Sequence, residues 1–280
     1  MKTGMNLLLW TGHVTAEHFP LIGKIKAAGY DGVEIPIFEG DPAHYKTIKA
    51  ELDKQGLKCT SVTVMNPDSN PISPDAAIRK AASERLKWAI DCNHALGAET
   101  MVGPFHSALG VFSGDPPTGD EKKRAVEVLR PAAELAKQAN LMLGIEYLNR
   151  FECYFLTTAA DAVSLVKEVN HPNFGTMYDT FHANIEEKAI GSTIESIAGS
   201  FIHVHISEND RSTPGEGGVN WNETFAALKE VKYDGWFVVE AFGLSLPALA
   251  AATKIWRRMF TDELTLATNA LKFMKSRWQG

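Results

Sequence analysis

Cysteine is scarce in this chain, which excludes two classes of small, cross-linked protein. The 280 residues include 3 cysteines, Cys59, Cys92 and Cys153, and none of them forms a CxxC pair. An odd, widely spaced set predicts neither a disulfide framework nor a thiolate metal site. We therefore interpret all of them as small core residues.

The sequence also lacks a long apolar run and an excess of basic residues. No run approaches the ~18 residues that span a bilayer, and the N-terminal "NLLLW" is shorter than the core of a signal peptide. The net charge of −6 offers no positive field for phosphate backbones. These absences predict a soluble, cytoplasmic protein that binds neither membranes nor nucleic acids, and whose partner is a small molecule.

No proline- or serine-rich linker interrupts the chain, so we expect one catalytic domain over residues 1–280. Short apolar runs alternate with longer amphipathic stretches, such as 121–139 and 159–169, which predict helices. The apolar runs predict strands. There are eight of them: 5–10, 32–37, 59–64, 100–105, 141–148, 174–180, 201–207 and 236–242.

Local signals predict where several helices begin and end. Ser73 followed by Pro74 is typical of a cap and a first helical position, and Thr158 with Asp161 predicts a capping box. Glycines close three of the predicted helices, each shortly before a strand, as the preference for glycine beyond a helix C-terminus predicts. They are Gly29, Gly56 and Gly97.

Eight strand–helix units with continuously apolar strands predict a parallel sheet that is covered on both faces. Closing that sheet gives a single (β/α)8 TIM barrel. A doubly wound open sheet is the alternative, but a dinucleotide site would need GxGxxG after the first strand, and "LLLWTGH" lacks it. The α/β barrel is therefore the predicted fold.

Chemistry-bearing residues stand at the ends of the last four predicted strands. Glu146 follows the apolar run "LMLGI", where an ionised carboxylate is costly unless a cation meets it. Asp179, His205 and Glu240 occupy the equivalent places in the next three strands. Catalytic groups of TIM barrels sit at these strand ends, and neighbouring strands lie about 5 Å apart, so the four side chains should converge.

Three carboxylates and one imidazole favour a divalent cation with a preference for oxygen. Mn²⁺ is the predicted ion, with Co²⁺ or Mg²⁺ as alternatives and Zn²⁺ less favoured. His203 lies two residues before His205, on the same side of the strand but one step lower. We interpret it as a supporting or core residue.

Several blocks resemble the ketose 3-epimerases, which comprise the D-tagatose, D-psicose (allulose) and L-ribulose 3-epimerases of the xylose isomerase-like TIM barrels. They are "GIEYLNRFE", "YDTFHANIEE", "HVHISENDRSTPGEG", "NWNETFAALKEVKYDGWFVVEAF" and "IWRRM", and the similarity runs from Gly4 nearly to the C-terminus. The resemblance implies one Mn²⁺ or Co²⁺ held by Glu146, Asp179, His205 and Glu240.

The same resemblance implies that the two glutamates are the catalytic acid/base pair for C3 epimerisation of a free ketose. It also implies substrate contacts, and assembly as a homodimer or homotetramer. Without the resemblance, Arg211 could instead pair with Glu208, Glu152 could be a solvated loop residue, and Phe242 could only plug the barrel. The implied substrate-binding residues are Glu152, His182, Arg211 and Phe242.

Trp10 and Glu34, at the ends of the first two predicted strands, could line or support the pocket. The loop after the fourth strand offers Leu109 and Phe112 where relatives often place a large aromatic residue, and "VEAF" and "SENDR" also depart from the family pattern. These sites face the far end of the sugar. The preferred ketose therefore stays open.

Other reactions share the same four residues. An aldose–ketose isomerase, a hydroxypyruvate isomerase and an inosose dehydratase all abstract a proton beside a carbonyl. "STPGEGG" makes a weak phosphate cradle because Glu216 would repel the anion. A sugar-binding protein without turnover and a phosphodiesterase on the same barrel are the alternatives from other classes.

Overall fold

Eight parallel strands form a closed barrel in the computed structural model, which describes residues 1–279. The first strand pairs with the last, Lys2 opposite Trp236 and Met5 opposite Val239, so the sheet has no free edge. The predicted fold is confirmed. The strands are β1 Lys2–Asn6, β2 Gly32–Pro36, β3 Lys58–Val62, β4 Thr100–Gly103, β5 Met142–Ile145, β6 Phe174–Asp179, β7 Phe201–Ile206 and β8 Trp236–Val239.

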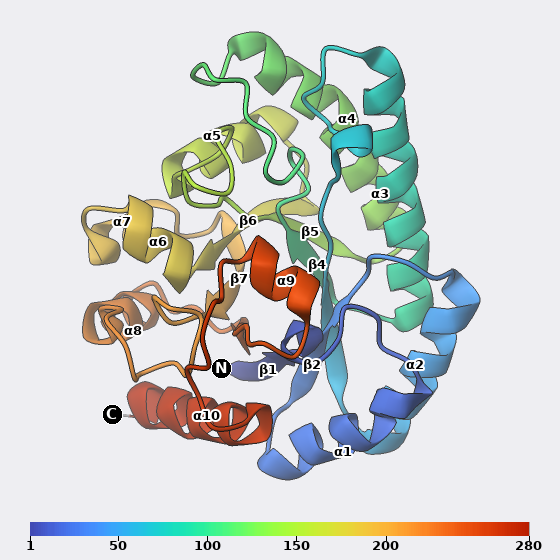
Figure 1. Ribbon diagram of the computed structural model, residues 1–280. Coiled ribbons are helices and arrows are strands. Elements are labelled where there is room, and N and C mark those ends of the chain that lie inside the picture. The colour runs from blue at the N-terminus through green and yellow to red at the C-terminus, as the bar shows by residue number, and fades with distance from the viewer. Residues whose placement is uncertain (280) are drawn as a thin grey trace.

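The helices surround this barrel (Figure 1). No helix within residues 1–279 is both long and apolar enough to cross a membrane. The α-helices are α1 Phe19–Ala28, α2 Pro42–Gln55, α3 Ala76–Leu96, α4 Gly119–Gln138, α5 Ala159–Val169, α6 Thr180–Glu186, α7 Ile190–Ser196, α8 Trp221–Glu230, α9 Pro247–Ala252 and α10 Glu263–Gln279. Short 3-10 helices are η1 Leu7–Leu9, η2 Ala16–His18 and η3 Pro67–Ser69.

Most local signals act as predicted. Thr158 accepts a hydrogen bond from the backbone of Asp161 and caps α5, and the three predicted glycines end α1, α2 and α3 in the left-handed conformation. The start predicted at Ser73 and Pro74 is wrong. Helix α3 begins at Ala76, because Asp75 is the residue whose carboxylate accepts the hydrogen bond from Ala77 N, at 2.8 Å.

The first strand differs most from its prediction, which placed it over 5–10. Strand β1 ends at Asn6, whose side-chain oxygen accepts a hydrogen bond from Leu8 N and starts η1. Trp10 therefore follows a 3-10 turn and does not end a strand. The apolar run "LLLW" continues past the ladder because it packs in the core, with Leu7 and Leu9 fully buried.

The outer face of the barrel packs on the helices. At the N-terminal end of the strands, hydrogen bonds and ion pairs of Glu99 connect the strands to one another. All 3 cysteines are buried in this core, as predicted. Glu99 accepts hydrogen bonds from Lys2, Lys58 and Trp236 Nε1, at 3.0, 2.7 and 3.0 Å. These contacts connect the starts of β1, β3, β4 and β8, and they leave the opposite, C-terminal end of the strands for the site.

Candidate metal centre and active site

The structure brings together the four residues that strand position predicted. Each of Glu146, Asp179, His205 and Glu240 offers one ligand atom, and these atoms all lie within 4.8 Å of one another. All four side chains are buried, with 0–4 % of the residue surface exposed. Such a group of buried charges requires a compensating cation or bound protons.

The two glutamates reach the site from different sides of the barrel. Glu146 follows β5 and Glu240 follows β8, and each is held by one further backbone bond to the neighbouring strand. Glu146 N donates to Gly103 O at 3.0 Å, and Glu240 N donates to Ile206 O at 3.2 Å. The predicted strand ends extended past these residues, but the ladder ends just before them.

Asp179 and His205 each have two polar side-chain atoms. One of them makes a hydrogen bond that fixes the orientation of the side chain, and the other faces the cluster. Asp179 caps α6, because its Oδ1 accepts from Phe181 N at 2.6 Å, and Oδ2 is left to face the cluster. His205 Nε2 donates to Glu34 Oε1 at 2.7 Å. Its Nδ1 then points toward the carboxylates, and within residues 1–279 this buried atom finds no hydrogen-bond partner.

Burial and neighbouring charges shift the pKa values of the site residues in different directions. Burial and the Glu240 carboxylate raise the pKa of Glu146 well above its ordinary value. Burial by itself lowers the pKa of His205, but Glu34 and Glu240 raise it well above its ordinary value. Burial also opposes ionisation of Asp179, yet Arg211 and His182 hold the pKa of that carboxyl well below its usual range.

The donor set fits one divalent cation. His205 Nδ1 lies 3.4 Å from Glu240 Oε1, 3.6 Å from Asp179 Oδ2 and 4.0 Å from Glu146 Oε1. Ligand atoms bound at about 2.0–2.2 Å from one ion are about 3–4 Å apart, so only small side-chain shifts would be needed. An unpaired imidazole nitrogen facing three carboxylates is the arrangement that such an ion stabilises.

Arg211 and His182 lie beside this cluster. Arg211 Nη1 donates to Glu240 Oε2 at 2.6 Å and to Asp179 Oδ2 at 3.3 Å, and Nη2 lies 3.0 Å from His182 Nε2. The guanidinium stacks 3.7 Å above the Phe181 ring. The alternative pairing of the Arg211 side chain with Glu208 is wrong, because the buried guanidinium faces the site instead.

The other predicted contact residues border the site less closely. Glu152 is half-buried and accepts from Asn149 Nδ2 at 2.8 Å, while Asn149 N donates to His182 Nδ1 at 3.0 Å. Phe242 is buried and its ring lies 5.0 Å from the Arg211 guanidinium. Phe242 therefore lies against Arg211, a direct partner of the cluster, whereas Glu152 is connected to His182 only through Asn149.

Asn6 and His106 had no assigned role at the sequence level, and the role of Glu34 was left open. Asn6 donates to Glu34 Oε1 at 2.9 Å and to Glu240 Oε1 at 3.3 Å. The buried His106 donates from Nε2 to the backbone oxygen of Glu146 at 2.8 Å. A polar residue inside an apolar strand, as Asn6 is in "MNLLLW", is the signal that could have found the first of them.

The segment after β8 covers the mouth of the barrel. Ala250 and Ile255 pack with Leu8 and Val102 in one apolar cluster, and Figure 1 shows α9 over the strand ends. A pocket of about 270 Å³ lies between this segment and Arg211. The buried charges are therefore separated from bulk solvent, which strengthens every electrostatic interaction between them.

Comparison with known proteins assigns the chain to a family. Residues 22–276 match the model of the xylose isomerase-like TIM barrels. The ketose 3-epimerase of Arthrobacter globiformis is 32% identical over 280 residues, which cover 99% of this chain and 96% of that protein. Both matches span nearly the whole barrel.

Solved structures give the same assignment. The D-allulose 3-epimerase of Methylomonas in complex with D-allulose superposes with a TM-score of 0.92 at 29% identity, covering 99% of this chain and 97% of that one. The D-psicose 3-epimerase of Clostridium cellulolyticum H10 with D-tagatose has a TM-score of 0.91 at 29% identity, with 99% of both chains covered. The chain therefore belongs to the ketose 3-epimerases of the xylose isomerase-like TIM barrels, and it is a carbohydrate epimerase of the isomerase class.

Proposed function

We propose that the protein interconverts the C3 epimers of free ketoses of the D-tagatose, D-psicose/D-fructose and L-ribulose type. The observation that carries the proposal is the convergence of Glu146, Asp179, His205 and Glu240 within 4.8 Å. Glu146 follows β5 and Glu240 follows β8, so a two-base reaction could use one of these carboxylates on each face of a sugar carbon. The relatives' complexes with D-allulose and D-tagatose support the choice of substrate class.

In this proposal the four converging residues hold one divalent cation. Mn²⁺ is the preferred ion, because three oxygen donors and one imidazole suit it better than a softer metal, and Co²⁺ or Mg²⁺ are alternatives. When bound, the ion would polarise the C2 carbonyl and stabilise the negative charge that develops on its oxygen. Its positive charge would also favour ionised Glu146, the form that acts as a base, and neutral His205, the form whose Nδ1 can be a ligand.

The chain's own residues move the proton. Glu146 takes the proton from C3, the C–H electrons form a C2–C3 double bond, and the carbonyl electrons move to the oxygen, which gives a planar enediolate. Glu240, which enters the step as the acid, then gives its proton to C3 from the opposite face, and the ketone re-forms. Exchange with solvent returns a proton to Glu240 and removes one from Glu146 before the next turnover. The two glutamates exchange roles when the other epimer is the substrate, and positioned proton transfer of this kind contributes about 10²–10⁴ in rate.

Neighbouring residues orient the sugar. We assign the O1 and O2 end to His182 and Arg211, which lie 3.0 Å apart beside Glu240. Burial lowers the pKa of His182 to about 3, so this imidazole is neutral and can accept or donate one hydrogen bond. Glu152 would accept a hydrogen bond from a hydroxyl group further along the sugar, and Phe242 would form one wall of the pocket.

Purified protein with Mn²⁺ and a panel of D-fructose, D-tagatose, D-psicose and L-ribulose in D₂O tests the proposal. We expect the C3 epimer of at least one ketose, with deuterium at C3 by NMR. Deuterium at C1 with formation of an aldose would instead identify an aldose–ketose isomerase. Binding of a ketose without any exchange would contradict both, and would identify a sugar-binding protein.

We also propose that residues 1–280 form one catalytic domain and that the protein assembles as a homodimer or homotetramer. The segment 244–260 supports the assembly, because Trp256 and Leu244 are 72% and 42% exposed. Sedimentation should give a mass of two or four chains. A W256E variant should shift that mass toward one chain, whereas a monomeric wild type would refute the assembly.

A further inference from the structure

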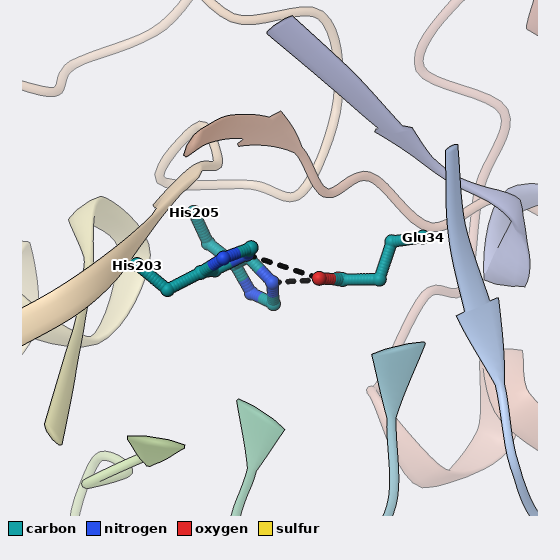
Figure 2. A group of neighbouring side chains, drawn as sticks. All are labelled: Glu34, His203 and His205. Carbon is teal, nitrogen blue, oxygen red and sulfur yellow. Dashed lines mark hydrogen bonds and ion pairs between the residues drawn. The ribbon is translucent and has the colours of Figure 1, made fainter. Parts of the chain in front are cut away.

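Glu34 is a fully buried carboxylate with a separate set of partners for each oxygen. Oε1 accepts from His205 Nε2 at 2.7 Å and from Asn6 Nδ2 at 2.9 Å. Oε2 accepts from Thr60 Oγ1 at 2.8 Å and lies 3.0 Å from His203 Nε2. Figure 2 shows Glu34 reaching from β2 across the barrel interior toward both histidines of β7.

The residues Glu34, His203 and His205 could themselves suggest a second metal site, because their donor atoms also lie close together. The contact distances favour hydrogen bonds instead. His205 Nε2 and Glu34 Oε1 are in direct contact at 2.7 Å, which is the length of a charge-assisted hydrogen bond, whereas two ligands of one ion lie about 3–4 Å apart. The same histidine also belongs to the candidate metal centre.

We propose that Glu34 is a positioning residue, which holds His205 so that Nδ1 faces the metal centre. By accepting from Nε2, it places the imidazole proton on the far side of the ring, and Nδ1 keeps the lone pair that a metal needs. This inference rests on the proposed metal-dependent function.

A second contact extends the same support to one of the glutamates. Asn6 donates both to Glu34 Oε1 and to Glu240 Oε1, so one amide connects the carboxylate of β2 to a proposed ligand that follows β8. The oxygen of Glu34 that faces the centre therefore supports two of the four proposed ligands, His205 directly and Glu240 through Asn6. The other oxygen contacts Thr60 and His203, one step deeper in the barrel.

Metal binding measured on stripped protein tests this inference. Titration with Mn²⁺ by calorimetry should give one site in the wild type. Glu34→Ala should raise the Mn²⁺ Kd about 10- to 100-fold, the usual effect of losing the partner of a ligating histidine. Glu34→Gln should raise it less, by about 3- to 10-fold, because an amide oxygen can still accept from Nε2.

Thr60→Val is the matched control, because it removes a buried hydrogen bond from the same carboxylate but on the deeper oxygen. It should change the Kd by less than about twofold, since the contact with His205 is intact. In the Mg²⁺-loaded protein, proton NMR should show a deshielded, slowly exchanging Nε2–H signal from His205 in the wild type and Thr60→Val, and this signal should be lost in Glu34→Ala.

The outcomes separate this inference from the proposed function. A wild type that binds no Mn²⁺ would overturn the metal-dependent function itself. A wild type that binds Mn²⁺ while both Glu34 variants bind it equally well would overturn only the positioning role. Equal losses in Thr60→Val and Glu34→Ala would do the same, because they would indicate a general effect on the core.

Discussion

Replacing Glu208 by glutamine should destabilise the loop that carries Arg211, although the two side chains have nearly the same shape. Glu208 is fully buried at the start of the segment between β7 and α8. Its Oε1 accepts from the backbone N–H groups of Asn209 and Val219, both at 3.0 Å. Its Oε2 accepts from Gly215 N at 2.8 Å and from Trp221 Nε1 at 2.9 Å.

The expected loss of stability follows from how the four hydrogen-bond donors are shared between the two oxygens of Glu208. Each oxygen serves one buried donor, Val219 N or Trp221 Nε1, and one donor nearer the surface. A glutamine turns one oxygen into an NH₂ group, so one buried donor is left unmet at a cost of about 1–3 kcal/mol. The remaining bonds also lose their charge assistance, and together the loss should reach about 2–4 kcal/mol.

Urea unfolding and thermal melting measure this loss. A loss of 2–4 kcal/mol should lower the melting temperature by roughly 3–7 °C in a chain of this size. Glu216→Gln is the matched control, because Glu216 is exposed on the same loop, and it should change stability by less than about 0.5 kcal/mol. Equal stability of the two variants would refute the view that Glu208 organises this loop.

The loop also matters for the site. Arg211 has a backbone φ of 62°, a left-handed conformation that a non-glycine residue adopts only when its surroundings hold it. Loss of the Glu208 contacts should therefore misplace the guanidinium beside Glu240. We expect epimerase kcat/KM to fall by about 10²-fold in Glu208→Gln, because small misplacements of a catalytic group cost that much.

Three further predictions concern the site, its pH response and the metal. Arg211→Lys should lower kcat/KM by about 10- to 100-fold, because an ammonium cannot contact Glu240 and His182 with the planar fork of a guanidinium. Burial alone would raise the pKa of Glu99, but its partners, led by Lys58, lower it to about 2. This carboxylate should therefore stabilise the fold above pH about 4.5, its ordinary pKa, and that contribution should disappear as the pH falls toward 2. A chelator should abolish activity and lower the melting temperature, and added Mn²⁺ should restore both.

Each of these three predictions has a control or an outcome that would contradict it. Unchanged kinetics in Arg211→Lys would contradict the assigned substrate contact. Unfolding of Glu99→Gln should match the wild type more closely at pH 3 than at pH 7, whereas Glu127→Gln, on the exposed side of α4, should not show this change. Full activity after exhaustive chelation would refute metal dependence.

The barrel and the convergence of its four strand-end residues could be predicted from sequence, because both depend on regular patterns. Continuous apolar strands separated by amphipathic helices specify the closed parallel sheet. The carboxyl ends of its strands meet at one mouth, so Glu146 and His205 could be placed near each other from strand position alone. The resemblance to the ketose 3-epimerases then supplied the reaction.

The supporting contacts could not be predicted in the same way, because they join residues that are far apart in the chain and have no shared pattern. Asn6 and Glu240 are separated by 234 positions, and their contact depends on the register of β1 against β8. The positioning role that we propose for Glu34 depends on which of its oxygens faces His205. The wrong helix start at Ser73 had a local cause, since Asp75, two residues later, is the stronger cap.

The most direct test of the two-base mechanism is hydrogen exchange at C3 in Glu146→Gln and Glu240→Gln, each confirmed to be folded and to bind Mn²⁺. In D₂O, neither variant should form the opposite epimer. Each should exchange the C3 proton of one epimer only, and the two variants should differ in which epimer that is, because one base remains on one face. Formation of the opposite epimer by either variant, at a rate near that of the wild type, would contradict the mechanism.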